Sequence, residues 1–202
     1  MIFASTSNIG LIRKENQDAL GYLKTDSSEL FVVCDGVSGL PHGALASKTV
    51  VDSILAVFSS NSKGGPEIQV QTAMQKAQNA VMNTNPKPLG TTAVVVYLLE
   101  GTAYAGWCGD SRIYHFRDHD IRWMSRDHNV LHDILNKGGS RGSIFLNPQA
   151  LNRFFGREFE VESEFYSFIV ELGDQILLCS DGLSNFLMEP DIIHAVTQNS
   201  PQ

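Results

Sequence analysis

Leu30-Phe-Val-Val-Cys-Asp35-Gly36 is a run of apolar residues that ends in a carboxylate and a glycine. An uninterrupted apolar run bounded by a turn residue is typical of a buried strand. Glycine then allows the backbone to turn sharply, so the strand delivers Asp35 near its end. Two further segments have a related form: Trp107-Cys-Gly109-Asp110-Ser111-Arg112 and Gln175-Ile-Leu-Leu-Cys-Ser-Asp181-Gly182.

This repeated pattern predicts acidic side chains gathered at one rim of a sheet. A single Asp-Gly pair is an ordinary turn signal, but here a carboxylate recurs at the end of apolar segments. Carboxylates brought together repel one another unless a cation neutralises them, and their hard oxygen atoms suit Mg²⁺ or Mn²⁺. The sequence therefore points first to a carboxylate metal site.

The bulk composition is that of an ordinary soluble protein. With 202 residues, 43% of them hydrophobic and 18% charged, the chain is long enough for one domain with its own core. The formal net charge of −7 argues against a nucleic-acid partner, which would favour a basic surface. The longest apolar run, Ala93–Leu99, is too short for a bilayer, which needs about 20 residues, and no signal peptide is visible. We therefore expect a cytoplasmic protein with no membrane association.

The three cysteines, Cys34, Cys108 and Cys179, have neither the spacing of a disulfide framework nor that of zinc ligands. Each lies in an apolar segment beside an acidic motif. We expect small buried hydrophobic side chains in a reducing compartment.

The periodicity of the apolar residues predicts helices separated by runs of strands. Helical spacing occurs over Gly43–Ser59 and Glu67–Asn83, and shorter helices are expected over Asn129–Asn136 and from Glu189 onward. Strands are expected in segments rich in β-branched and aromatic residues: one before and one after a loop within Ile2–Leu23, then Leu30–Cys34, Thr91–Leu99, Thr102–Gly106, Ser111–Phe116, Glu162–Val170 and Gln175–Cys179. This order favours a single α+β layered domain over residues 1–202 rather than a βαβ fold.

Several unusual segments can be placed in chain order: Gly10-Leu-Ile-Arg13-Lys-Glu-Asn16-Gln17-Asp18, Asp35-Gly36-Val37-Ser38-Gly39, Gly90-Thr91-Thr92, Gly109-Asp110-Ser111-Arg112, Arg126-Asp127-His128 and Ser180-Asp181-Gly182. Their order and spacing resemble the metal-dependent type-2C protein phosphatases (the PPM family), particularly the small bacterial members. The resemblance covers nearly the whole chain. It implies two antiparallel β-sheets packed as a sandwich and flanked by helix pairs, with a metal cluster in a cleft at one end.

The resemblance also implies roles for individual acidic residues. Asp35 would bridge two Mg²⁺ or Mn²⁺ ions, and the carbonyl of Gly36 would complete the shell of the first. Asp18 and Asp181 would bind the second ion. Asp127 would help Asp181 to hold a third, weaker ion.

Arg13 would grip the phosphate of the substrate, because its planar fork matches two phosphate oxygens at once. Two ions about 3.5–4 Å apart would lower the pKa of a water between them, and the resulting hydroxide would attack phosphorus in line. The implied function is a serine/threonine phosphatase that acts as a monomer on proteins phosphorylated by a serine/threonine kinase.

Each of these residues also has a plain structural interpretation. Arg13 alone would be a solvated surface charge, Asp18 would cap a turn, and Asp127 would cap the helix expected after it. We expect Asp110 to support the site from behind, either by pairing with Arg112 or by accepting backbone N–H bonds.

Other segments carry simpler expectations. Gly90-Thr91-Thr92 should serve packing, because small residues let strands approach the site. The glycine-rich loop Lys137–Gln149 corresponds to the family's mobile flap, where Lys137 and Arg141 would meet the substrate; a plain surface loop is the alternative. Surface positions are expected for the histidines without recognisable spacing: His115, His119, His132 and His194.

The sequence departs from the family pattern in two places. Bacterial members usually continue Asp-Gly with Met-Gly-Gly-His, whereas this chain has Val37-Ser38-Gly39-Leu40, and His42 is a poor replacement for the missing imidazole. The family's final aspartate–asparagine motif is not reached before Gln202, and Asp191 lies too close to Asp181 to replace it. We expect either a longer natural protein or a weakened or inactive member that binds phosphoproteins as a regulatory module. A phosphatase for small phosphorylated metabolites is a third alternative.

Overall fold

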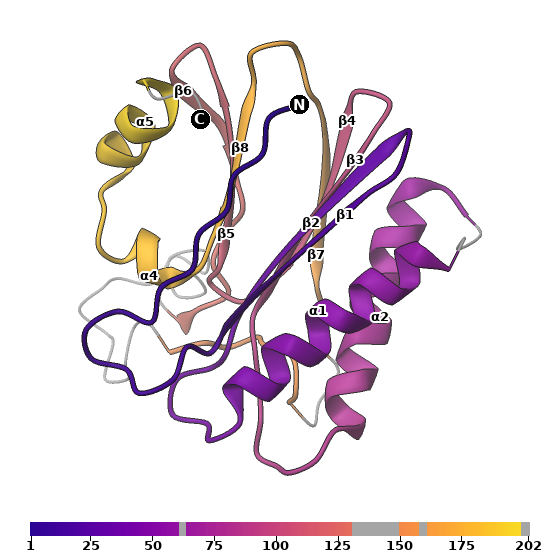
Figure 1. The fold of residues 1–202 in the computed structure, drawn as a ribbon, viewed down its shortest axis with the longest axis vertical. Coiled ribbons are helices and arrows are strands. Elements are labelled where there is room, and N and C mark those ends of the chain that lie inside the picture. Colours follow the sequence, from indigo (N-terminus) through magenta and orange to yellow (C-terminus); the bar gives the residue numbers. More distant parts are fainter. Residues whose placement is uncertain (61–63, 131–149, 158–160, 199–202) are drawn as a thin grey trace.

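Two antiparallel sheets, packed face to face, form the centre of the molecule (Figure 1). The computed structural model describes residues 1–60, 64–130, 150–157 and 161–198. Within these ranges, the five-stranded sheet has the order β1-β2-β3-β4-β7, with β1 Asp18–Lys24, β2 Ser28–Asp35, β3 Ala93–Leu99, β4 Thr102–Cys108 and β7 Glu164–Ile169. The three-stranded sheet has the order β6-β5-β8, with β6 Asp120–Met124, β5 Arg112–Arg117 and β8 Gln175–Cys179.

Helices cover the outer face of each sheet. The five-stranded sheet carries α1 Gly43–Ser59 and α2 Pro66–Asn83, and the three-stranded sheet carries α5 Glu189–Gln198, which follows the short helix α4 Asp181–Ser184. The layers run α-β-β-α, so the predicted α+β sandwich is confirmed. No helix in the described ranges has both the length and the apolar composition needed to cross a membrane.

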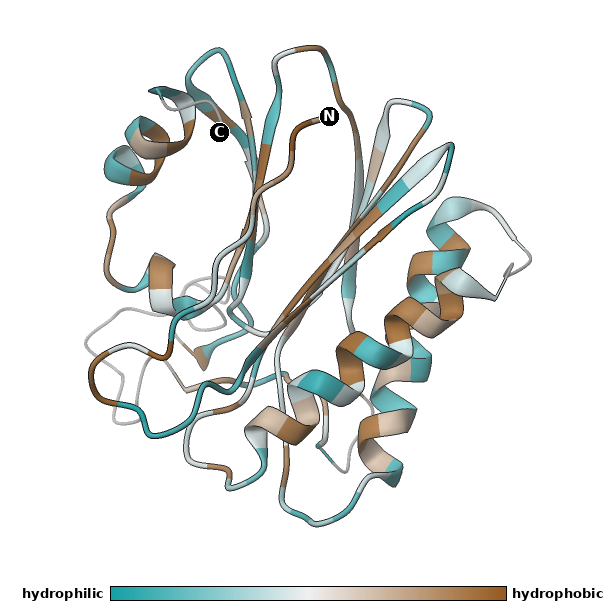
Figure 2. Ribbon diagram, viewed as in Figure 1, coloured by the Kyte–Doolittle hydropathy of each residue, from teal (hydrophilic) through white to brown (hydrophobic). Residues whose placement is uncertain are grey.

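The apolar run of β3 is explained by burial on both faces of its sheet. Ala93 and Val95 belong to the core beneath α1 and α2, whereas Val94 and Val96 belong to the core between the sheets. Figure 2 shows hydrophobic residues concentrated along the strands, while the helices mix hydrophobic and hydrophilic positions. β-branched side chains suit a strand that is covered on both sides.

Ion pairs around the buried carboxylate of Asp174 hold the turn that connects β7 to β8, where the chain leaves one sheet for the other. Asp174 Oδ2 lies 2.8 Å from Nε2 of His115, and Oδ1 accepts a 2.7 Å hydrogen bond from Nε of Arg117. Arg117 also pairs with Glu171 at 2.6 Å. Burial acts to raise the pKa of Asp174, but hydrogen bonds from Arg117 and the Glu171 backbone hold the pKa below its ordinary value. The predicted surface position of His115 is wrong, since its side chain is only 5% exposed.

Two predicted details of the strands need correction. The strand expected before the loop within Ile2–Leu23 is absent, because the described residues 1–17 form an irregular and mostly exposed segment without ladder partners. Conversely, β6 is a strand that the residue pattern does not predict. Its hairpin with β5 turns through Asp118 and His119 at φ 52° and 61°, a left-handed pair that glycine or asparagine usually occupies.

Some predicted features lie outside the described residues. These are the body of the helix expected over Asn129–Asn136, His132, and the flap residues Lys137 and Arg141. His119 and His194 are exposed, as predicted.

Candidate functional site

Strand pairing brings the first two acidic residues together. In the antiparallel ladder of β1 and β2, Asp18 lies directly opposite Asp35, each at one end of its strand. Residues directly opposite one another project from the same face of a sheet. Oδ1 of Asn16 accepts the N–H of Asp18 at 3.1 Å, so Asn16 forms the turn and leaves the Asp18 carboxylate free for other partners.

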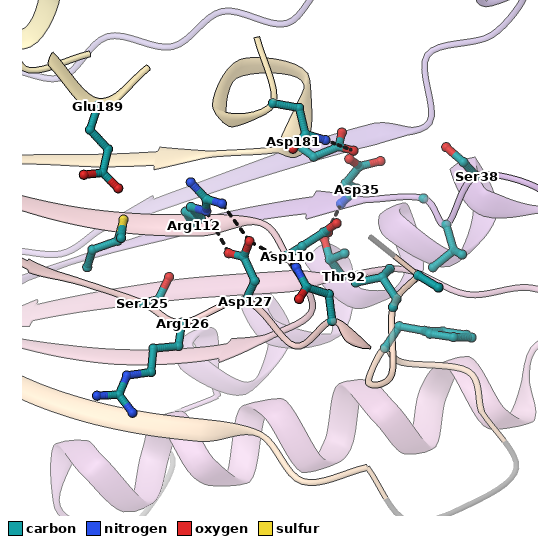
Figure 3. A pocket seen from close by; sticks show the side chains of 18 of the residues that line it. Asp35, Ser38, Thr92, Asp110, Arg112, Ser125, Arg126, Asp127, Asp181 and Glu189 are labelled. Atoms are coloured by element: carbon teal, nitrogen blue, oxygen red, sulfur yellow. Dashed lines mark hydrogen bonds and ion pairs between the residues drawn. The ribbon is translucent and has the colours of Figure 1, made fainter. Parts of the chain in front are cut away.

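Asp181 reaches the same place from the second sheet. It begins α4 just after β8 ends. Ser180 Oγ donates to Oδ2 of Asp18 at 3.1 Å, and Asn185 Nδ2 donates to Oδ2 of Asp181 at 3.0 Å. Figure 3 shows the side chains of Asp181 and Asp35 close to one another. Acidic residues far apart in the sequence therefore converge between the two sheets.

Asp35 is the strongly perturbed member of this cluster. Burial, the charges of Asp18 and Asp181, and hydrogen bonds with both carboxylates raise its pKa from 3.8 to about 9. Carboxylates this close do not all remain charged at neutral pH without a compensating cation. A hard divalent ion is the cation that a cluster of oxygen ligands favours.

The side chain of Asp35 hydrogen-bonds those of Asp18 and Asp181, and the three do not surround a common centre. Within the described ranges, no three Asp, Glu, His or Cys side chains already stand around a metal position. The closeness of the carboxylates indicates a metal site, whereas the present directions of their oxygens do not. Proximity is the better guide, because hydrogen-bonded carboxylates turn their oxygens toward one another, and side-chain rotation can turn them toward an ion. The donor set fits Mg²⁺ or Mn²⁺.

The Thr91-Thr92 pair holds the backbone of Asp35. The N–H of Asp35 donates to Oγ1 of Thr92 at 3.0 Å, while Oγ1 of Thr91 and the N–H of Thr92 donate to the Asp35 carbonyl at 2.9 and 2.8 Å. At Gly36, a Cβ would lie 2.6 Å from the carbonyl carbon of Gly43. The threonines thus do more than pack, and position 36 has no room for a side chain.

Asp127 is held by Arg112 in a bidentate ion pair. Nε and Nη2 of Arg112 each donate to one carboxylate oxygen at 2.7 Å. Of the two contacts expected for Asp110, the structure shows the hydrogen bond from the backbone and not the ion pair with Arg112. Burial and the charges of Asp181 and Asp127 raise the pKa of Asp110 to about 6. Asp110 is thus close to the cluster at Asp181.

Arg13 lies on the exposed segment before β1 and reaches the loop that follows β2. Its Nη2 donates to Oγ of Ser38 at 2.8 Å. Ser38 and Asp35 line the same cavity, so the hydrogen bond to Ser38 brings the Arg13 guanidinium beside a residue of the cavity wall. His42 occupies the N-cap of α1. It is not among the described residues that line this cavity.

A cavity of about 960 Å³ opens over the acidic cluster. Its lining includes Asp35, Asp110, Asp127 and Asp181, and it extends toward Arg126 (Figure 3). The strand ends of both sheets therefore share one open site, large enough for a phosphorylated side chain and its neighbours.

The cysteines behave as predicted. Cys34, Cys108 and Cys179 are free and buried. Burial raises the pKa of Cys108 and Cys179 to about 12, so neither forms a thiolate at neutral pH. No cysteine among the described residues is therefore suited to act as a nucleophile.

Several side chains that hydrogen-bond the acidic residues were not assigned this role from the sequence: Thr92, Ser180 and Asn185. Their only signal in the sequence is a hydroxyl or amide close to an acidic motif. Such residues are equally common in ordinary turns, so their roles become visible only in three dimensions.

Comparison with known proteins agrees with this geometry. The family model described as Protein phosphatase 2C matches residues 13–199. A putative protein phosphatase of Mycoplasma genitalium is 26% identical over 219 residues, covering 98% of this chain and 83% of that protein. The serine/threonine phosphatase stp of Listeria monocytogenes is 27% identical, covering 91% of this chain and 78% of that protein.

Solved structures share the fold. The serine/threonine phosphatase of S. agalactiae superposes with a TM-score of 0.84 at 22% identity, covering 96% of this chain and 85% of that one. The catalytic domain of the phosphatase PstP, in complex with 2 manganese ions, gives a TM-score of 0.73 at 24% identity over 92% and 80% of the two chains. Because the family model spans nearly the whole sequence, this chain belongs to the Protein phosphatase 2C family.

Proposed function

We propose that this chain is a metal-dependent protein serine/threonine phosphatase. The observation that carries the proposal is the convergence of Asp18, Asp35 and Asp181 from both sheets. Phosphoryl transfer requires positive charge beside the phosphoryl oxygens, and this cluster is suited to hold cations at an open cavity. Relatives named serine/threonine phosphatase support the class of substrate.

Asp35 would hold two Mg²⁺ or Mn²⁺ ions, with the carbonyl of Gly36 on one ion and Asp18 and Asp181 on the other. When bound, the ions supply a water activated for attack on phosphorus and neutralise charge on the phosphoryl oxygens. Asn185 would orient Asp181 through the 3.0 Å hydrogen bond to Oδ2, which leaves Oδ1 for a cation.

A third ion beside Asp181 would take Asp110, rather than Asp127, as its second carboxylate ligand. Arg112 engages both oxygens of Asp127, whereas Asp110 lies close enough to Asp181 for their charges to interact. This proposal revises the role that the family resemblance implies for Asp127, which becomes the anchor of Arg112.

Arg13 would bind the phosphate of the substrate at the rim of the cavity, and Lys137 and Arg141 would add positive charge from the flap. The substrates would be proteins phosphorylated by a serine/threonine kinase, and we place the enzyme in the cytoplasm as a monomer. The net charge of −7 supports a partner other than nucleic acid.

Release of phosphate from a phosphothreonine peptide, with and without Mn²⁺, tests the proposal. We expect Mn²⁺-dependent turnover that Asp35→Asn abolishes. Asp26→Asn makes the same chemical change in the exposed turn between β1 and β2, at the far end of the strands, and should retain activity.

Absence of turnover at every Mn²⁺ concentration would refute the proposal. Phosphopeptide binding without turnover would instead identify a phosphoprotein-binding module. Faster hydrolysis of sugar phosphates than of phosphopeptides would identify a phosphatase for small metabolites.

A further inference from the structure

The Arg13 guanidinium is held by a side chain that the proposed chemistry does not itself require, the hydroxyl of Ser38. The contact is 2.8 Å long and joins residues 25 positions apart. We propose that Ser38 is a positioning residue that presents Arg13 to the phosphate of the substrate. This inference rests on the proposed phosphatase function.

The segment that carries Arg13 has little support of its own. Its neighbours Leu11 and Ile12 are 105% and 93% exposed, and Gly10 turns the chain at φ +74°. Local packing therefore does little to orient the Arg13 side chain. Arginine has many rotamers, so an external contact is needed to keep its guanidinium at one place.

Ser38, in contrast, belongs to a loop with a fixed backbone. The N–H of Gly36 donates to the carbonyl of Gln17 at 3.1 Å, and the N–H of Val37 donates to the carbonyl of Gly90 at 2.9 Å. The N–H of Leu40 closes the loop by donating to the carbonyl of Val37 at 3.1 Å. The Ser38 hydroxyl is therefore held at a fixed position relative to Asp35. Through its hydrogen bond it can hold the Arg13 guanidinium at a fixed position as well.

The chemistry of the contact leaves Arg13 able to bind an anion. A guanidinium has five N–H donors, and the bond to Ser38 uses only Nη2. The acceptor is a neutral hydroxyl, so the positive charge is not cancelled. Arg112 provides the contrast in the same structure, because the Asp127 carboxylate engages two of its nitrogens and neutralises its charge.

A double-mutant cycle on the Mn²⁺-loaded protein tests this proposal with Ser38→Ala, Arg13→Ala and the combined variant. The readouts are the inhibition constant of inorganic phosphate and KM and kcat for a phosphothreonine peptide. We expect Ser38→Ala to raise the inhibition constant and KM about 3- to 10-fold, with kcat and Mn²⁺ affinity changed less than about 2-fold. The effect should vanish in the Arg13→Ala background, and Ser38→Thr, which keeps the hydroxyl, should restore the wild-type values.

Equal effects of Ser38→Ala with and without Arg13 would overturn the proposal, as would a Ser38→Thr variant impaired as much as Ser38→Ala. Ser38→Gly, which also removes the hydroxyl, is a second variant that should behave like Ser38→Ala. If the wild type shows no turnover, the proposed function fails. Calorimetric binding of the phosphopeptide would then still measure the coupling between Arg13 and Ser38, so the two failures are distinguishable.

Discussion

Replacement of Asp35 by asparagine should stabilise the metal-free protein. The same replacement should abolish turnover by the protein supplied with Mn²⁺. Asparagine has nearly the same shape but cannot carry the charge that Asp18 and Asp181 oppose. A rise in pKa from 3.8 to about 9 corresponds to an upper limit of about 7 kcal/mol, at about 1.36 kcal/mol per unit. Because the carboxylates share this repulsion and relax as it grows, we expect a gain of about 2–4 kcal/mol near pH 8.

The pH dependence of this gain has a definite sign. Since the pKa of Asp35 is raised in the folded state, that state binds more protons than the unfolded state between about pH 4 and pH 9. The contribution of Asp35 to the free energy of unfolding of the metal-free wild type should therefore be most favourable at the acidic end of this window. It should fall as the pH rises, and Asp35→Asn should remove that slope.

Thermal unfolding of the metal-free protein across this pH window measures the effect. For a chain of this size, 1 kcal/mol shifts the melting temperature by about 2–4 °C, so Asp35→Asn should melt about 5–15 °C higher near pH 8. The difference should shrink toward about pH 4. Asp26→Asn, on the exposed β1–β2 turn, controls for the loss of one formal charge. An Asp35→Asn variant no more stable than the wild type near pH 8 would refute the convergence of the carboxylates.

Further substitutions test other parts of the structure. Gly36→Ala should lower the free energy of unfolding by about 2–4 kcal/mol, because its Cβ would meet the backbone at the start of α1. Gly65→Ala has nothing within 4 Å and is the control in the same urea titration, where its place at the N-cap of α2 should cost at most about 1 kcal/mol. Arg112→Ala should lower that free energy by about 2–4 kcal/mol by leaving Asp127 unpaired, and unchanged stability would argue against the ion pair. Asp174→Asn should remove a stabilisation that is present at neutral pH and lost as the pH falls below about 4, so its unfolding curve should approach that of the wild type in acid.

The order of strands and helices could be predicted where a residue pattern had one physical meaning. The β-branched run of β3 is such a case, because only a strand covered on both faces uses it fully. The apolar residues near the N-terminus are different, since Phe3 stacks on Tyr22 at a centroid distance of 4.6 Å instead of joining a ladder. β6 depends on a turn without glycine, which carries no clear signal.

The members of the acidic cluster could be predicted, but their partners could not. Asp35 ends the apolar strand β2, and Asp181 comes shortly after the apolar strand β8. The position of each residue at the end of a strand could therefore be read from the neighbouring residues alone. The choice of Arg112 between Asp110 and Asp127 depends on how the segment after β6 returns to the start of β5. Sequence distance favours Asp110, whereas packing selects Asp127.

Calorimetric titration of Mn²⁺ tests most directly whether the converging carboxylates form a metal site. The wild type and Asp26→Asn should bind two ions, and Asp35→Asn should lose binding because both ions depend on the same carboxylate. Equal Mn²⁺ binding by the wild type and Asp35→Asn would contradict the account.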